Sequence, residues 1–272
     1  MFPQRVLLIL FAFLLATSTG CDCGTHDAGS TPAPPEPEAA AEPSGAADEA
    51  GEAAEEEDEA AAEEEAGPVD NVIEARPDAA TVLMENEWVR VVRFALEPGD
   101  ALPVHDGPAR LVFSETDARI RWTEGDAEPV EVEWSGGDLH THGPGPHAVE
   151  NAGDEPISWV VFARLDADLV VEEDAEDVGH ADSERATVRF EDDLVRVVQV
   201  ELAAGEETSM HPGGPRVIFA QADYRIRYHR EGTEPVEREL EAGSAHWHGA
   251  GRHQVSNIGD THARYLVVLF QR

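Results

Sequence analysis

The chain has 272 residues, enough for one large domain or two small ones. It holds 57 acidic and 19 basic residues, which gives a formal net charge of −38. Such a chain repels nucleic-acid phosphates and anionic lipid headgroups, which argues against a nucleic-acid partner. Every basic residue is an arginine, so a Schiff-base mechanism through lysine is excluded. Both cysteines precede residue 25, so no disulfide can hold the later part of the chain together.

The first residues have the order of a secretory signal peptide. One positive charge, Arg5, is followed by an apolar run at residues 6–16, which is too short to cross a bilayer comfortably. Small residues then lead to Cys21. This order predicts a cleaved signal peptide over residues 1–20.

The step from Gly20 to Cys21 resembles the bacterial lipoprotein signal, in which the cysteine becomes the acylated N-terminus. The sequence departs from that pattern at Ser18, where the family usually has an aliphatic residue. The resemblance implies lipidation of Cys21, export across the inner membrane and anchoring in the bacterial cell envelope, with membrane contact through the lipid alone. A plain secreted protein is the alternative.

Residues 21–75 are dominated by Ala, Glu, Pro and Gly, with almost nothing apolar and larger than Ala. A segment of this composition cannot bury enough surface to offset its conformational entropy. We expect a disordered acidic tether that separates the anchor from the folded part.

An internal repeat sets the architecture of the remainder. Residues 80–162 align without a gap on residues 186–268, at a constant offset of 106. This duplication predicts two similar domains, over residues 76–166 and 185–272, joined by a short acidic linker at residues 167–184.

Each repeat has the pattern of β structure. Residues 89–96 are rich in β-branched side chains and end at a Pro-Gly turn. Residues 117–122 and 130–134 alternate polar and apolar side chains around a turn, which predicts a hairpin with one buried face. Residues 158–162 and 263–270 are expected to close the two units. Short strands between Gly, Pro and Asp turns indicate an all-β barrel or jelly roll.

Two motifs recur in both repeats. Gly99 precedes His105 by six positions, as Gly205 precedes His211, and a later strand ends in His-x3-Asn at residues 147–151 and 253–257. These motifs resemble those of the cupin superfamily, and the resemblance covers both repeats. It implies two tandem cupin-type double-stranded β-helix barrels, which together form a bicupin.

The same resemblance implies a metal site made of two His and a Glu from the first motif and one His from the second. The sequence departs from it, because Gly107 and Gly213 replace the second His. The Glu position falls at residues 111–112 and 217–218, where no carboxylate is present. The usual four-ligand site is therefore incomplete in both repeats.

Additional histidines suggest a rebuilt site. His140 and His142, like their repeat mates, are two residues apart on a strand and therefore share a face. If that face lies inside the barrel, three imidazoles could converge in each repeat and bind a divalent transition metal such as Zn, Fe, Ni, Cu or Mn. The candidate ligands are His105, His142, His147, His211, His248 and His253, with His140 and His246 as alternatives. Histidines that merely belong to the scaffold and hold no metal are the competing interpretation.

Arginines supply a second kind of candidate site. Arg110 and Arg216 follow the first His of each repeat and are placed to clamp the carboxylate of a small molecule, with a rim salt bridge as the alternative. Trp122 and Trp134 are expected to lie in the core. The arginines and glutamates of the hairpin are expected to form cross-strand ion pairs.

Three functions remain open at this point. The first is a tethered bicupin that binds a small molecule or a metal ion. The second is a metal-dependent enzyme of dioxygenase or isomerase type, for which no catalytic residue can be assigned, and the third is a structural protein of the envelope. The first two predict histidines that point inward and converge. The oligomeric state stays open.

Overall fold

The computed structural model describes residue 69 and residues 71–166, 168–169 and 177–271. The predicted signal peptide, Cys21 and most of the predicted tether lie outside these residues. Within the described part of the chain, no helix has the length and apolar character needed to cross a bilayer.

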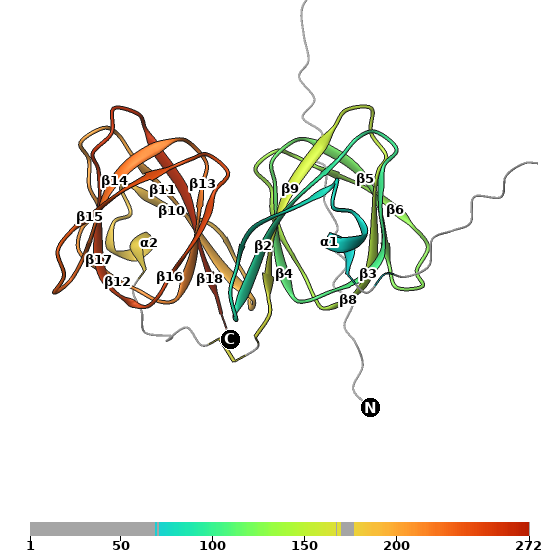
Figure 1. Cartoon of the computed structure of the whole chain (residues 1–272), viewed down its shortest axis with the longest axis horizontal. Helices are drawn as coiled ribbons and strands as arrows, with labels where there is room; N and C mark the ends of the chain where they lie inside the picture. Colours follow the sequence, from blue (N-terminus) through green and yellow to red (C-terminus); the bar gives the residue numbers. More distant parts are fainter. Residues whose placement is uncertain (1–68, 70, 167, 170–176, 272) are drawn as a thin grey trace, which may run out of the picture. The chain divides into compact units, whose positions relative to one another are not determined.

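The strands of the first repeat form two sheets that enclose a barrel (Figure 1). A five-stranded sheet has the order β1-β2-β9-β4-β7, and a four-stranded sheet has the order β3-β8-β5-β6. Neighbouring strands are antiparallel. The strands are β1 (Ala80–Glu85), β2 (Val89–Leu96), β3 (Ala101–Gly107), β4 (Arg110–Ser114), β5 (Ala118–Glu124), β6 (Val130–Trp134), β7 (Leu139–His142), β8 (Gly145–Asn151) and β9 (Ile157–Arg164).

The second repeat has the same topology. Its five-stranded sheet runs β10-β11-β18-β13-β16 and its four-stranded sheet runs β12-β17-β14-β15. The strands are β10 (Ala186–Glu191), β11 (Val195–Leu202), β12 (His211–Gly213), β13 (Arg216–Ala220), β14 (Tyr224–Arg230), β15 (Val236–Leu240), β16 (Ala245–His248), β17 (Gly251–Asn257) and β18 (Ala263–Phe270). The expected all-β architecture of two tandem barrels is confirmed.

Short helices precede each barrel. Helix α1 (Val72–Ala75) lies before the first, and α2 (Val178–Ala181) lies before the second. Val178 of α2 is buried in the core of the second barrel, and Asp177 forms an ion pair with Arg196 at 2.5 Å. Part of the segment expected to be a linker is therefore packed onto the barrel that follows it.

The predicted hairpin is present as β5 and β6. Arg119 pairs with Glu133 in the backbone register, and its side chain forms an ion pair with Glu131 at 2.5 Å. Arg121 lies 3.5 Å from the same carboxylate. These exposed pairs account for the hairpin charges without a binding role.

Buried hydrophobic residues form three clusters. One fills the interior of the first barrel and includes Leu96 and Ile120, and one fills the second and includes Leu202. The third contains residues of both barrels, among them Leu111 and Phe219. Because side chains alternate along a strand, the five-stranded sheets present one face to a barrel interior and the other to this shared cluster.

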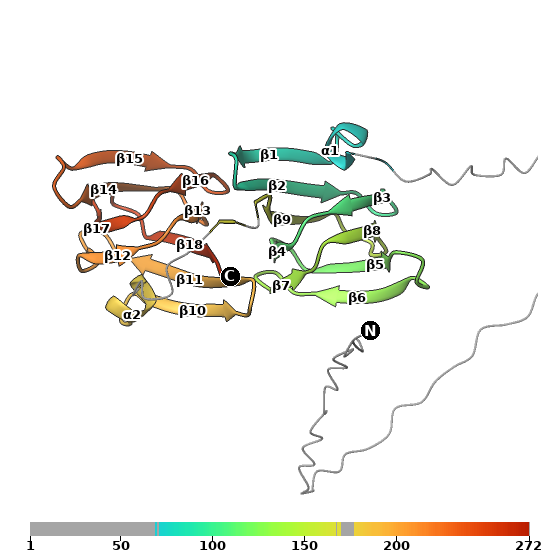
Figure 2. The ribbon, with the colours of Figure 1, turned by 90° about the horizontal axis from the view of Figure 1, so that it is seen from below.

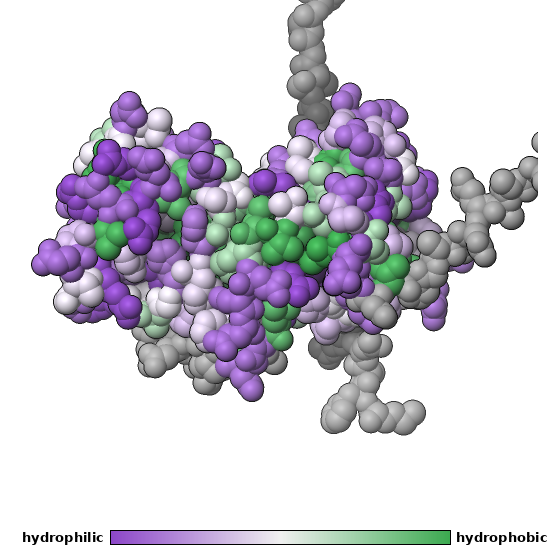
Figure 3. Space-filling view, viewed as in Figure 1, coloured by the Kyte–Doolittle hydropathy of each residue, from purple (hydrophilic) through white to green (hydrophobic). Residues whose placement is uncertain are grey.

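Strand contacts also connect the two repeats. Strand β1 lies beside β16 of the second barrel, and β10 lies beside β7 of the first (Figure 2). Trp88 stacks on Trp247 with ring centroids 5.2 Å apart. On the visible face, hydrophilic residues cover both ends and hydrophobic residues gather in a band across the middle (Figure 3).

Candidate functional site

Each barrel contains a pair of histidines on neighbouring strands. His105 of β3 is directly opposite His147 of β8, and His211 of β12 is directly opposite His253 of β17. The ring centroids are 4.1 Å apart in the first barrel and 4.2 Å apart in the second. All four side chains are buried. Cross-strand pairing therefore brings together the histidines that the two motifs predicted.

Backbone carbonyls determine which ring nitrogen of these histidines carries the proton. Nδ1 of His105 lies 2.8 Å from the Pro103 carbonyl, and Nδ1 of His211 lies 2.8 Å from the Ser209 carbonyl. Nδ1 of His253 lies 3.3 Å from the Gly251 carbonyl. A carbonyl only accepts, so each Nδ1 carries the proton and donates. The Nε2 atom of each neutral ring is then a hydrogen-bond acceptor.

Burial keeps the rings neutral. Burial and the nearby Arg110 charge lower the pKa of His147 to about 3. Burial and the Arg216 charge lower the pKa of His253 to about 2. Near neutral pH both rings therefore present a lone pair at Nε2 rather than a proton.

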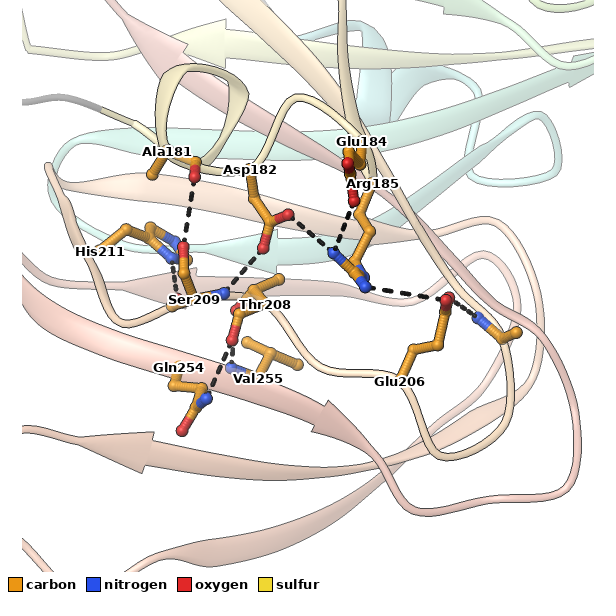
Figure 4. A network of polar contacts seen from close by, with 11 residues as sticks. Ala181, Asp182, Glu184, Arg185, Glu206, Thr208, Ser209, His211, Gln254 and Val255 are labelled. Carbon is orange, nitrogen blue, oxygen red and sulfur yellow. Dashed lines mark hydrogen bonds and ion pairs between the residues drawn. The ribbon is translucent and has the colours of Figure 1, made fainter.

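A polar network holds β12, and with it His211, against α2 (Figure 4). The Ser209 backbone N–H donates to Asp182 at 2.7 Å, and the Ser209 hydroxyl donates to the Ala181 carbonyl at 3.3 Å. Arg185 forms an ion pair with the same Asp182 at 3.1 Å. The segment that precedes the second barrel therefore positions the carbonyl that orients His211.

A buried arginine lies beside each histidine pair. Arg110 begins β4 and Arg216 begins β13, and they are 5% and 3% exposed. Leu111 and Val217 belong to the shared cluster, so the neighbouring arginines point into the barrels. The first residue of β4 and the first residue of β13 therefore each place a guanidinium beside the histidine pair of their barrel.

The second barrel links its arginine to its histidine directly. Nη2 of Arg216 donates to Nε2 of His253 at 2.8 Å. Nη1 donates to the Gly214 carbonyl at 2.9 Å and to the Gly249 carbonyl at 3.3 Å. In the first barrel, Nη1 of Arg110 donates to the Pro108 carbonyl at 3.1 Å. We call these groups, Arg110 with His147 and Arg216 with His253, the two clamps.

Neither guanidinium has a carboxylate partner among the described residues. Every ion pair found in that part of the chain involves other arginines or His180. Burial lowers the pKa of Arg110 to about 10, which the charge of Glu124 only partly offsets, and burial also lowers the pKa of Arg216. A buried charge without a counter-charge is costly, so each clamp favours an anion. The alternative of a rim salt bridge does not describe these residues.

Two glycines make room for the clamps. A Cβ atom at Gly213 would lie 2.8 Å from Nη1 of Arg216 and 2.8 Å from Cε1 of His253. At Gly107 the equivalent distances, to Arg110 and His147, are both 2.7 Å. A Cβ atom at either glycine would therefore force the arginine and histidine side chains beside it to shift.

The additional histidines do point inward. Leu139 of β7 packs on the shared cluster and Thr141 donates to Asp192 of the second barrel, so His140 and His142 lie on the opposite, interior face. The second repeat matches this arrangement, because Trp247 packs on the shared cluster and its neighbours His246 and His248 line the second cavity.

The structure does not assemble these histidines into a metal site. Among the described residues, no group of three or more His, Cys, Asp or Glu side chains is arranged to hold a metal ion. In the first barrel the indole of Trp122 stacks on both His142 and His147, at 4.5 and 4.9 Å between centroids. In the second, the Tyr228 ring contacts both His248 and His253, at 5.2 and 5.5 Å. An aromatic ring thus takes space that a shared ion would need.

The donor set also does not fit a divalent cation. Nε2 of His253 accepts from a guanidinium, which is itself a cation. Two histidines and no carboxylate are fewer ligands than a catalytic centre usually has. The expected three-histidine sites, His105 with His142 and His147, and their repeat mates, are therefore not supported by the arrangement.

Two histidine nitrogen atoms inside the first barrel have no hydrogen-bond partner among the described residues. Nε2 of His140 and Nε2 of His142 are buried and form no hydrogen bond to any described residue. Burial lowers the pKa of the two rings to about 4 and about 3, so both are neutral near pH 7. Unpaired buried polar atoms of this kind are the usual positions of ordered water.

Each clamp faces a cavity. The cavity of the second barrel has a volume of about 450 Å³, and that of the first barrel about 250 Å³. Trp122 and Trp134, expected in the core, line the first cavity. Trp159 and Tyr265 line the two cavities from the last strand of each repeat and were not among the predicted site residues. The alignment of the two repeats could have pointed to them, because an aromatic residue occupies this position in both repeats.

The comparisons with known proteins support the fold. A tryptophan variant of the Bacillus subtilis oxalate decarboxylase is 15% identical over 71% of this chain and 72% of its own, with a TM-score of 0.53. The Lactobacillus farciminis oxalate decarboxylase in complex with formate is 14% identical over 71% of this chain and 80% of its own, with a TM-score of 0.50. Another Bacillus subtilis oxalate decarboxylase structure, studied for its Mn(II) centres, is 14% identical over 71% and 72% of the two chains, also with a TM-score of 0.50.

No protein-family model matches the sequence, and no curated protein matches it. The similarity to the solved structures is below the level at which function carries over. It shows that the chain has the fold of a bicupin, as the sequence motifs indicated.

Proposed function

We propose that this protein binds small organic carboxylates in its barrels, through the two clamps and without a metal ion. The observation that carries the proposal is Arg216, a buried guanidinium that has no carboxylate partner among the described residues and that lines a cavity of about 450 Å³. That volume lies within the range of about 300–1,000 Å³ usual for small-molecule sites.

The geometry of the second clamp favours a planar anion. His253 and the two glycine carbonyls occupy Nη2 and Nη1 of Arg216 and hold the guanidinium in one orientation. A carboxylate is the group that matches guanidinium geometry and supplies the missing negative charge. Neutral His211 and His253 add no positive charge, so specificity for the anion rests on the arginine.

Calorimetric titration of the full chain in the presence of a chelator tests this. Benzoate, succinate and gluconate are the anions, and benzamide, succinamide and glucose are their neutral counterparts. We expect at least one carboxylate to bind and its neutral counterpart not to. Arg216→Gln or Arg110→Gln should weaken that binding about 10- to 100-fold, because a charge-assisted hydrogen bond contributes about 1.5–3 kcal/mol.

Arg225→Gln provides the matched control. Arg225 lies on the same barrel, is exposed and forms an ion pair with Glu237 at 2.6 Å. Its substitution should leave the affinity unchanged. Equal binding of an anion and its amide, or unchanged affinity in both clamp variants, would contradict the proposal.

A metal-dependent enzyme remains the second candidate, because the fold is shared with oxalate decarboxylases. It predicts about one tightly bound metal per barrel after addition of Mn, Zn, Fe, Ni or Cu. That metal would be lost in the double variants His105→Ala/His147→Ala and His211→Ala/His253→Ala. Binding of a carboxylate through the clamps should instead be the same with and without chelator. If neither metal nor carboxylate binds, a structural role in the envelope is the remaining function.

We further propose that the barrels are displayed in the bacterial cell envelope from a lipid on Cys21, by way of the acidic segment. The support is the signal-like order of residues 1–20. The full chain should fractionate with membranes, and Cys21→Ser should release it. Membrane association that survives Cys21→Ser would overturn the anchor.

A further inference from the structure

The two barrels keep the same clamp but differ in the walls of their cavities. At the offset of 106, the arginine and histidine of the clamp are identical in the two repeats. The histidine opposite the clamp and the glycine packed beside it are identical as well. The cavity positions are not: Trp122 corresponds to Tyr228, and Trp159 corresponds to Tyr265. These wall positions have changed since the duplication, whereas the positions of the clamp have not.

The first cavity is small and aromatic. Trp122, Trp134, Trp159 and Phe94 line it, and the Phe94 and Trp159 rings stack at 5.5 Å between centroids. The Arg110 guanidinium carbon lies 5.8 Å from the Trp122 ring, a cation–π distance. At about 250 Å³ the cavity is below the usual size for drug-like ligands. These aromatic walls offer flat apolar surface to a ligand, and Asn71, Arg90 and Asp106 also line the cavity.

The second cavity is larger and carries hydroxyl groups. All three tyrosines of the protein, Tyr224, Tyr228 and Tyr265, line it. The Tyr224 and Tyr265 rings lie 5.6 Å apart, and the described part of the chain gives their hydroxyls no hydrogen-bond partner. Burial raises the pKa of both phenols, so they stay protonated and can donate.

Replacement of Trp134 by Leu240 at the equivalent position adds room. Charged residues of both signs also line the second cavity, namely Arg230, Arg238, Asp177, Glu234 and Glu239. The second barrel thus combines the same anion clamp with space and with free hydroxyl donors.

We infer that the chain has two carboxylate sites of different selectivity. The first barrel takes a small, planar, apolar carboxylate, and the second takes a larger carboxylate that carries hydroxyl groups. The tryptophan-lined walls of the first cavity offer the hydroxyl groups of a ligand fewer hydrogen-bond partners than the tyrosine-lined walls of the second. An apolar ligand in the tyrosine-lined cavity would leave buried phenol hydroxyls unpaired. This inference rests on the proposed function, because the clamps supply the common part of both sites.

The test is calorimetric titration of the full chain with two probes, benzoate for the first barrel and gluconate for the second. Arg110→Gln disables one clamp and Arg216→Gln disables the other, so each variant reports on the remaining barrel. We expect Arg110→Gln to weaken benzoate at least 10-fold and leave gluconate unchanged. Arg216→Gln should do the reverse.

The wall residues give a second readout that does not disturb the clamps. Tyr265→Phe removes one hydroxyl and keeps the ring, so gluconate should weaken about 10-fold while benzoate stays unchanged. Trp159→Phe reduces the aromatic wall of the first barrel, so benzoate should weaken while gluconate stays unchanged. A thermal melt of each variant shows whether it is folded.

The outcomes separate this inference from the proposal on which it rests. If each clamp variant weakens benzoate and gluconate to the same extent, carboxylate binding stands and the difference in selectivity is overturned. If Tyr265→Phe is folded and binds gluconate like the parent, the assignment of the hydroxyls is overturned. If neither probe nor any other carboxylate binds the parent chain, the proposed function itself fails.

Discussion

Arg216 and His253 depend on each other. The guanidinium charge helps to lower the pKa of His253 to about 2, which keeps Nε2 free to accept from Nη2. The neutral ring in turn holds the guanidinium toward the cavity. A protonated imidazole could not do this, because it would present a second donor and a second positive charge.

This coupling has a consequence for acid stability. The unfolded chain binds a proton on His253 near the ordinary pKa of 6.5, whereas the folded chain binds it only near pH 2. Below pH 6.5 the unfolded state therefore holds more protons, and the free energy of unfolding falls as the pH falls. The slope from one such histidine is at most about 1.4 kcal/mol per pH unit.

His253→Gln should therefore make the pH dependence between pH 6.5 and 4.5 shallower. Urea unfolding at a series of pH values measures it, with exposed His262→Gln as the control. A slope that is the same in both variants would mean that His253 titrates freely in the folded protein.

Gly213 gives a second prediction at the scale of one residue. Gly213→Ala places a Cβ atom 2.8 Å from both Arg216 and His253, so the clamp must shift. We expect a loss of stability of about 1–3 kcal/mol, as for other overpacked sites, together with weaker carboxylate binding. Gly136→Ala is the control, because no atom lies closer than 3.4 Å to its Cβ position and it is remote from the second cavity. Equal effects of the two substitutions on melting and binding would show that the clamp tolerates the methyl group.

The sequence indicated which histidines lie close together, but it did not indicate where the arginine side chains point. The motif spacing singled out His105 and His147, and the strand register places the two residues opposite each other. It could not show that Arg110 points into the barrel, since that depends on Leu111 packing against the other barrel. Nor could spacing show that Trp122 would stack on two of the candidate ligands.

At the scale of the element, the end of β17 is held by a side chain. Asn257 is 1% exposed. Its Nδ2 donates to the Leu202 carbonyl at 2.9 Å and to the Thr261 carbonyl at 2.8 Å, and its Oδ1 accepts from Gly259 at 3.1 Å. This asparagine therefore ties β17, which carries His253, to the end of β11.

Asn257→Ala should cost about 2–3 kcal/mol, because it leaves buried backbone groups unpaired. Ser256→Ala, at the partly exposed neighbour that donates to Glu207, should cost less than about 1 kcal/mol. Chemical unfolding compares the two. A loss in Asn257→Ala no larger than that in Ser256→Ala would contradict this role for the asparagine.

The strands themselves were predictable from alternation and turn residues. Residues 89–96 and 263–270 are strands with the expected bounds. The segment before the second barrel was expected to be a linker because it is short and acidic. Its acidic residues are nevertheless used: Asp177 pairs with Arg196 and Asp182 binds the Ser209 backbone, contacts between residues distant in sequence that composition does not reveal.

At the scale of the whole molecule, the duplication predicted two barrels, and the structure adds a core shared by both. Phe219 of the second barrel is 2% exposed and contacts Phe113 and Phe162 of the first, at 5.7 and 5.8 Å between ring centroids. Sequence alternation alone could not distinguish this face from a barrel interior, since both are apolar. A shared core of this kind couples the unfolding of the two barrels.

Phe219→Ala should lower the free energy of unfolding by about 3–5 kcal/mol. Calorimetry should show one cooperative transition in the parent, because the barrels share this cluster. Val236→Ala, at an exposed position of the same barrel, should change little. Two independent transitions in the parent would contradict the coupling.

We expect a carboxylate, and no metal ion, to bind beside Arg216 and the histidine pair of the second barrel. A crystal structure of the full chain grown with gluconate, with Mn(II) also present, tests it most directly. We expect a carboxylate within hydrogen-bond distance of the Arg216 guanidinium in the second cavity, with His253 still accepting from Nη2. A metal ion bound to both His211 and His253, with Arg216 turned away, would contradict it.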